Sequence, residues 1–102
     1  MLIVLTTTPG IDEAESLAEK IVAAKLAACV QILPQMTSVY FWAGKVRTEP
    51  EHLLLIKTLP EKWDELRDLI TANHSYSVPE IIAVDAEKVS DGYLAWMMDY
   101  LS

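Results

Sequence analysis

Strand-like and helix-like segments alternate along this chain in an order that few folds accommodate. A continuous apolar run ending in threonines, residues 1–8, predicts a strand that is buried on both faces. Apolar residues at helical spacing then predict a helix over residues 12–26. Asp12 followed by Glu15 resembles a capping box at the start of that helix.

The middle of the chain predicts a strand that turns back on itself. Residues 28–42 are expected to form a long strand, with an edge or a bulge at Pro34 because proline has no N–H group to donate to the ladder. Residues 43–45 are typical of a hairpin turn, and residues 53–58 of the returning strand. The polar segment 47–51 is expected to bulge.

The last part of the chain predicts a helix, a strand and a further helix. Pro60 suits the first turn of a helix that ends near residues 73–74. Residues 79–85 are expected to form a strand. Ser90 is expected to cap a final helix that ends at Leu101 and is apolar around nearly its whole circumference, so it needs partners on more than one side.

The predicted order is β-α-β-β-α-β followed by a C-terminal helix, in one domain over residues 1–102. It predicts an α+β, ferredoxin-like fold, in which two helices cover one face of a four-stranded antiparallel sheet. The other face would carry the aromatic residues of the second strand. With 52% hydrophobic residues in 102, the chain holds more apolar material than a small domain easily hides. We therefore expect self-association.

Charge and cysteine content exclude several classes of protein. A net charge of -7 predicts no nucleic-acid partner, and no cluster of lysine or arginine suits an anionic membrane. The longest apolar runs are far shorter than the roughly 20 residues that span a bilayer. No signal peptide is visible, and the single cysteine cannot form an internal disulfide, so we expect a cytoplasmic protein.

Several short motifs, spread over essentially the whole chain, resemble the divalent-cation tolerance proteins called CutA. They occur in the family's order and at its spacing, which makes the set specific although each motif alone is weak. They are Leu26-Ala27-Ala28-Cys29-Val30, Ser38-Val39-Tyr40 with Trp42 and Gly44-Lys45, Ile56-Lys57-Thr58, His74 with Tyr76, Val78-Pro79-Glu80-Ile81, and Tyr93-Leu94 with Trp96.

The resemblance implies a ferredoxin-like subunit in a tight homotrimer, with strands of neighbouring subunits paired edge to edge. It also implies a cytoplasmic protein linked to tolerance of copper and other divalent ions. Because the architecture is similar to that of trimeric nitrogen-regulatory signal proteins, a signalling role with a protein or small-molecule effector is the alternative.

The chain departs from the family pattern at two places. It reads His74-Ser75-Tyr76 where the family usually has His-Pro-Tyr. Some bacterial members are associated with copper through a cysteine late in the first strand and two consecutive histidines. The matching positions here are Thr6, Asn73 and His74, of which only His74 is a good copper ligand.

His74 and Cys29 are the candidate metal ligands, and each has a plainer interpretation. Cys29 is the only thiol, and a free cysteine usually behaves as a small buried hydrophobe. His74 closes the second helix, where a hydrogen bond or the helix dipole explains it equally well. A divalent cation such as copper is the one cofactor expected.

The candidate ligand residues lie on the strands and the loop that the family resemblance places at the cleft between subunits. Lys57 interrupts an apolar strand, and a buried lysine needs a partner, for which Glu80 is the candidate. Tyr40, Trp42 and Tyr76 are expected to wall the same cleft. The alternatives are a lysine at the solvent-facing end of its strand and aromatic residues that only pack.

No motif supports catalysis. The chain lacks a glycine-rich phosphate loop and a nucleophile elbow, and only Cys29 with His74 could supply a nucleophile and a base. We therefore expect a binding protein that contributes to divalent-cation tolerance, or an interaction scaffold without a metal site of its own, and not an enzyme.

Overall fold

The computed structural model describes all 102 residues of the chain, and its order of elements confirms the α+β, ferredoxin-like prediction. The long second strand that was predicted is divided in two. The elements are β1 (Leu2–Thr8), α1 (Ile11–Ala23), β2 (Cys29–Ile32), β3 (Met36–Trp42), β4 (Lys45–Thr58), η1 (Pro60–Lys62), α2 (Trp63–Asn73), β5 (Ile82–Asp85) and α3 (Asp91–Leu101).

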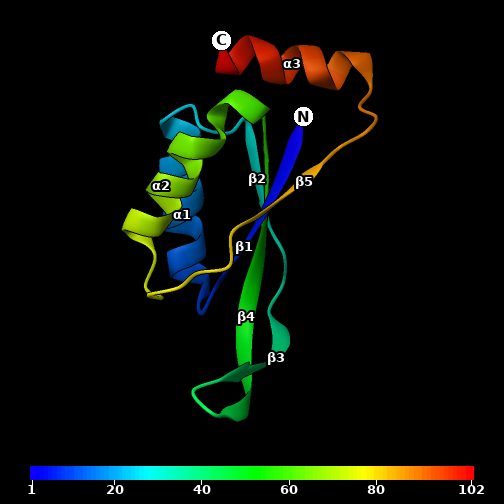
Figure 1. The fold of residues 1–102 in the computed structure, drawn as a ribbon. Helices are drawn as coiled ribbons and strands as arrows, with labels where there is room; N and C mark the ends of the chain where they lie inside the picture. Colours follow the sequence, from blue (N-terminus) through cyan, green and yellow to red (C-terminus); the bar gives the residue numbers. More distant parts are fainter.

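The sheet is antiparallel throughout, with strand order β2-β4-β1-β5, and β3 pairs with the far half of β4. Helices α1 and α2 lie together on one face of the sheet, while α3 crosses one end of the molecule (Figure 1). At the other end β3 and the first half of β4 project as a hairpin, which we call the arm (Figure 1). The molecule is therefore elongated, with extents of 45 × 25 × 23 Å.

The core lies between the sheet and the two helices on its covered face. Alternate residues of β1 and β4 meet the apolar stripes of α1 and α2 there, as the period of two and the helical spacing require. The fully buried aliphatic side chains include Val4, Leu54 and Ile56 from the strands and Leu17, Ile21, Leu66 and Ile70 from the helices. Thr6 and Thr8 share the buried side of β1 with Val4.

The arm ends in the predicted hairpin turn. Ala43 and Gly44 both have positive φ, 52° and 82°, between the paired residues Trp42 and Lys45. Two central residues in the left-handed region give a turn whose twist matches that of the flanking strands.

The prediction of a bulge over residues 47–51 is wrong, because β4 is continuous there. Pairing runs without interruption from Trp42 opposite Lys45 to Met36 opposite Glu51. Pro50 is tolerated because this half of β4 has only β3 as a neighbour, so its free edge needs no N–H donor.

The bulge lies instead at Pro34, where the sequence predicted either an edge or a bulge. Residues 33–35 on the connection between β2 and β3 stand opposite only His52 and Leu53 of β4, so one strand has an extra residue. This offset is what separates β2 from β3 and lets the arm leave the main sheet.

The two ends of α1 and both predicted caps differ from expectation. Helix α1 stops at Ala23 rather than at residue 26, and Lys25 adopts a left-handed φ of 56° after it. The capping box is not formed, because the helix begins at Ile11 and Gly10 is its N-cap residue, which places Asp12 inside the first turn. Ser90 is the N-cap residue of α3, but its side chain makes no capping hydrogen bond.

The last strand is shorter than predicted. β5 pairs with β1 only from Ile82 opposite Leu5 to Asp85 opposite Leu2. Residues 75–81 run as a loop past the remaining part of β1, since Pro79 has no N–H to contribute to a ladder. This loop forms one side of the groove described below.

Much apolar surface stays exposed on the single chain. Phe41 and Val46 in the arm are each 70% exposed, and Trp96 of α3 is 51% exposed although Met97 beside it is fully buried. None of the helices is long and apolar enough to cross a membrane.

A candidate ligand-binding groove

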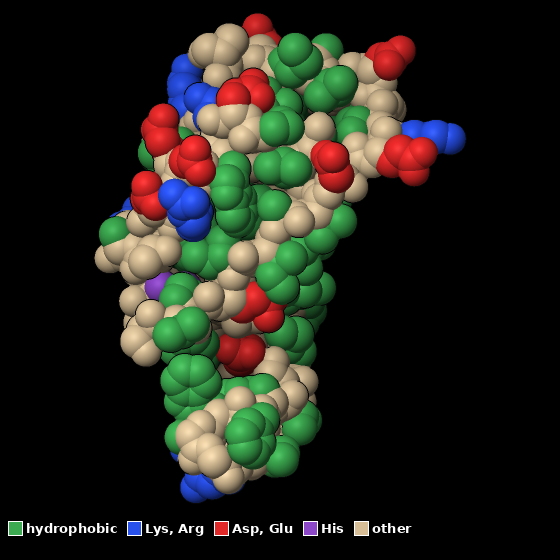
Figure 2. Space-filling model, in the orientation of Figure 1, with side chains coloured by type: hydrophobic (Ala, Val, Ile, Leu, Met, Phe, Trp, Pro, Cys, Tyr) green, Lys and Arg blue, Asp and Glu red, His purple; other side chains and the backbone are tan.

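A groove of about 640 Å³ lies where the arm meets the body of the protein. One wall is β3, the other is the loop formed by residues 75–80, and Thr7 and Glu51 lie between them. Figure 2 shows acidic side chains set among hydrophobic ones between the body and the arm, with the lysines and arginines of this face lying away from them. Neither lysine nor arginine lines the groove, so its charge comes from Glu51 and Glu80.

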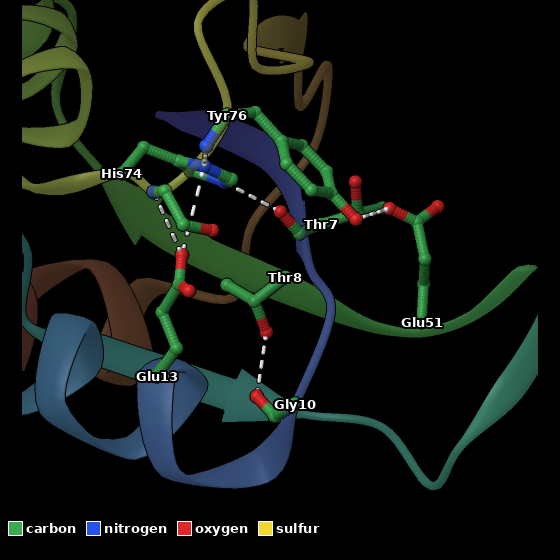
Figure 3. A network of polar contacts seen from close by, with 8 residues as sticks. Thr7, Thr8, Gly10, Glu13, Glu51, His74 and Tyr76 are labelled. Carbon is green, nitrogen blue, oxygen red and sulfur yellow. Dashed lines mark hydrogen bonds and ion pairs between the residues drawn. The ribbon is translucent and has the colours of Figure 1, made fainter.

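A part-buried hydrogen bond joins the two sides of the groove. The Tyr76 hydroxyl donates to Oε2 of Glu51 at 2.9 Å, and Glu51 is only 7% exposed (Figure 3). Burial, and then the hydrogen bond to Glu51 and the charge of that carboxylate, raise the pKa of Tyr76 above its usual range. The phenol therefore keeps its proton at neutral pH and remains a donor.

His74 fixes the loop to the sheet through both of its ring nitrogens. Nε2 lies 2.6 Å from the carbonyl oxygen of Thr7, which can only accept, and the backbone N–H of Tyr76 donates to Nδ1 at 3.0 Å (Figure 3). The imidazole is therefore the neutral tautomer with its proton on Nε2. Its side chain is fully buried, and the histidine positions Tyr76 above the groove.

Glu13 of α1 holds the same loop from the other side. Its Oε2 accepts a hydrogen bond of 3.1 Å from the backbone N–H of Ser75 and lies 3.6 Å from Nδ1 of His74 (Figure 3). Ser75, at the position where the family resemblance implies a proline, thus supplies an N–H that proline lacks.

The two predicted metal ligands are not brought together. His74 contacts Thr7 at one end of β1, whereas Cys29 lies beside Lys57, which is opposite Ile3 near the other end. No three histidine, cysteine, aspartate or glutamate side chains form a group that could hold a metal ion. Since both nitrogens of His74 are already hydrogen-bonded, these residues do not fit a copper site within one chain.

The predicted pair of Lys57 and Glu80 is not formed within the chain. Nζ of Lys57 lies 5.5 Å from the centre of the Tyr93 ring, a cation–π contact with α3. Glu80 lines the groove, whereas Lys57 does not. Lys57 is opposite Ile3, four residues along β1 from the groove residue Thr7. The other predicted cleft residues, Tyr40, Trp42 and Tyr76, do line it.

Three residues of this region were missed from the sequence. Glu51 was assigned to a polar bulge, Glu13 to the start of a helix, and Thr7 to the interior of a strand. The available signal is weak: only His52 separates Glu51 from the apolar half of its strand.

The groove offers carboxylate and hydroxyl oxygens beside aromatic rings. Its polar donors and acceptors include Glu51, Glu80 and the side chains of Ser38, Ser77 and Tyr76, and it contains no sulfur or imidazole. The two acidic groups favour a positively charged ligand near Glu51. Further along the arm Arg47, which is opposite Tyr40, donates to the Trp42 carbonyl oxygen at 3.2 Å, so that end carries a positive charge.

Comparisons with known proteins agree along the whole chain. The sequence profile of the CutA1 divalent ion tolerance protein family matches residues 2–100. A divalent-cation tolerance protein CutA from Thermus thermophilus is 39% identical over 95% of this chain and 94% of its own length. A chloroplastic CutA protein from Arabidopsis thaliana is 45% identical over 94% of this chain, which spans only about half (53%) of the length of that relative.

The fold also matches that of a solved structure. The crystal structure of CutA1 from Oryza sativa superposes with a TM-score of 0.96 at 42% identity, covering 99% of this chain and 93% of that one. Both the sequence and the fold therefore place the chain in the CutA1 divalent ion tolerance protein family.

Proposed function

We propose that this member of the divalent-cation tolerance family acts as a homotrimer that binds a divalent cation or a small ligand in the groove, at the cleft between subunits. The observation that carries the proposal is the buried carboxylate of Glu51. It lies in a groove without lysine or arginine, with Glu80 as a second acidic group. A carboxylate removed from water is costly unless a positive charge or several donors compensate it.

The donor set favours some cations over others. Glu51 and Glu80 would hold the ion, with hydroxyl groups of the groove beside them, and oxygen ligands of this kind suit magnesium, calcium or manganese. Copper prefers nitrogen and sulfur ligands, so copper binding would require donors from a neighbouring subunit.

The exposed apolar surface supports the homotrimer. Val39, Phe41 and Val46 of the arm are each about two-thirds exposed or more, and β3 has one unpaired edge. Neighbouring subunits that pair with this edge would cover these side chains and would close the groove. We place the protein in the cytoplasm, and we assign it no enzymatic activity.

An interaction scaffold is the second candidate. It is favoured by the lack of any preassembled group of three metal-binding side chains in the chain. Capture of partners from native extract, compared between the wild type and Trp42→Ala, tests it. Identical partner lists would contradict a scaffold that works through the groove.

Titration calorimetry of the assembled protein tests the main proposal. We expect Mg²⁺, Mn²⁺ or Cu²⁺ to bind more tightly than about 0.2 mM, which corresponds to about 5 kcal/mol. Glu51→Gln should abolish this binding, and Glu65→Gln, which removes an equal charge on the exposed side of α2, should not. Absence of binding in that range, or equal binding by Glu51→Gln, would contradict the proposal.

A further inference from the structure

The carboxylate of Glu51 has no cation near it within the chain. The ion pairs of the protein join Arg67 to Asp64 and Asp68, and Glu13 to His74 when the imidazole is protonated, and none involves Glu51. Its one hydrogen-bond partner is the Tyr76 hydroxyl. At 7% exposure, the carboxylate has only this one neutral donor from the chain, and its second oxygen is left open to the groove.

The walls of the groove are aromatic, with Tyr76 beside the carboxylate and the other rings further along the arm. Tyr40 and Trp42 share one face of β3, and Tyr76 faces them from the loop across the groove. The faces of such rings attract organic cations. Val39 and Val78 add apolar surface to the lining.

The same walls discriminate between kinds of cation. A hydrated metal ion needs several oxygen ligands and gains little from aromatic or aliphatic walls. An ammonium or guanidinium group needs only one carboxylate and neighbouring hydroxyls, while its apolar body packs against the rings. A volume of about 640 Å³ is in the range of small-molecule sites.

We propose that the groove binds a small organic cation, with an ammonium or guanidinium head at Glu51 and an apolar or aromatic body against Tyr76 and towards Tyr40. The organic-cation proposal rests on the proposed function in one respect, that the groove is a binding site. It adds the chemical class of the ligand.

Calorimetry with three ring compounds of one shape tests the charge requirement. Benzamidinium, neutral benzamide and anionic benzoate are titrated into the full-length, assembled protein. We expect benzamidinium to bind at least about tenfold more tightly than benzamide, and benzoate not to bind, because a charged hydrogen bond in a desolvated site is worth that factor. Equal binding of benzamidinium and benzamide, or no binding of benzamidinium, would overturn the proposal.

Two variants locate the site. Glu51→Gln should weaken benzamidinium by about tenfold or more, while Glu65→Gln, an equal change of charge on α2, should leave it unchanged. Circular dichroism and light scattering establish that both variants keep the fold and assembly. Unchanged binding by Glu51→Gln would contradict the assignment.

A parallel titration with Mg²⁺, Mn²⁺ and Cu²⁺ separates this proposal from the divalent-cation site. Benzamidinium binding without metal binding would refute the metal site alone. Metal binding without benzamidinium binding would refute the organic-cation site alone. If neither binds, both proposals fail.

Discussion

The hydrogen bond between Tyr76 and Glu51 ties the loop after α2 to the base of the arm, and single residues around it determine the shape of the groove. His74 contributes by accepting the Tyr76 N–H and donating to Thr7, and Glu13 by accepting from Ser75. His74 and Tyr76 are predictable from the family motif. Their partners Glu13, Thr7 and Glu51 are not, because they are distant in sequence and meet only after the sheet forms.

Replacing Tyr76 by phenylalanine should lower stability and change its dependence on pH. The folded chain holds the phenolic proton more tightly than the unfolded chain, whose tyrosine pKa is about 10. The contribution of Tyr76 to stability is therefore present below about pH 10 and is lost as the pH rises further. Urea unfolding should show the wild type losing stability above that pH more steeply than Tyr76→Phe. Parallel curves would contradict the assignment.

Thr6 is a second residue whose environment sets a testable energy. Its side chain is fully buried on the covered face of β1, and its hydroxyl has no hydrogen-bond partner. Thr6→Val keeps the shape and removes the unpaired group, so it should raise the free energy of unfolding by about 1 kcal/mol.

Thr58→Val is the matched control for Thr6→Val. The Thr58 hydroxyl is equally buried but donates to the Leu26 carbonyl oxygen at 2.7 Å. Its loss should therefore destabilise the protein by about 1 kcal/mol. If both variants shifted stability in the same direction in chemical denaturation, the difference in hydrogen bonding would not explain the energies.

At the scale of elements, hydrophobic periodicity predicted α1 and α2, because each buries one regular stripe against the sheet. The first strand followed from a continuous apolar run, and α3 from its all-round apolar surface. The predictions failed where a boundary depends on tertiary pairing. β4 continues through Pro50 because it has a free edge there, and β5 starts late because residues 75–81 follow the groove. Half of the groove lies on that loop, so its shape was beyond local sequence patterns.

The hairpin of the arm gives a prediction for one element. Gly44 has φ +82°, where an L side chain is strained although space is free around it. Gly44→Ala should destabilise the arm by about 1 kcal/mol, and Ala43→Gly, which relieves a φ of 52°, should stabilise it by a similar amount. Hydrogen exchange of the arm amides measures both, and equal protection in the two variants would contradict the turn assignment.

At the scale of the whole molecule, the high apolar content of the sequence corresponds to particular exposed surfaces. They are the arm, the outer side of β5 and part of α3, with Phe41, Ile82 and Trp96 as examples. The family resemblance supplied the trimer, whereas composition alone predicted only self-association.

Light scattering should give a mass close to that of three 11.4 kDa chains at micromolar concentration. Phe41→Ser with Val46→Ser should reduce that mass, since these two side chains are 70% exposed on the single chain and need a partner to cover them. A monomer in the wild type would contradict the homotrimer.

The most direct test of function is the growth of a host that lacks its own family member, in graded concentrations of divalent cations. The wild-type protein should extend growth to higher concentrations of Cu²⁺ or Mn²⁺. Glu51→Gln, expressed to the same level and assembled to the same mass, should lose that protection, while Glu65→Gln should keep it. Full protection by Glu51→Gln would contradict the claim that the groove is where this protein acts.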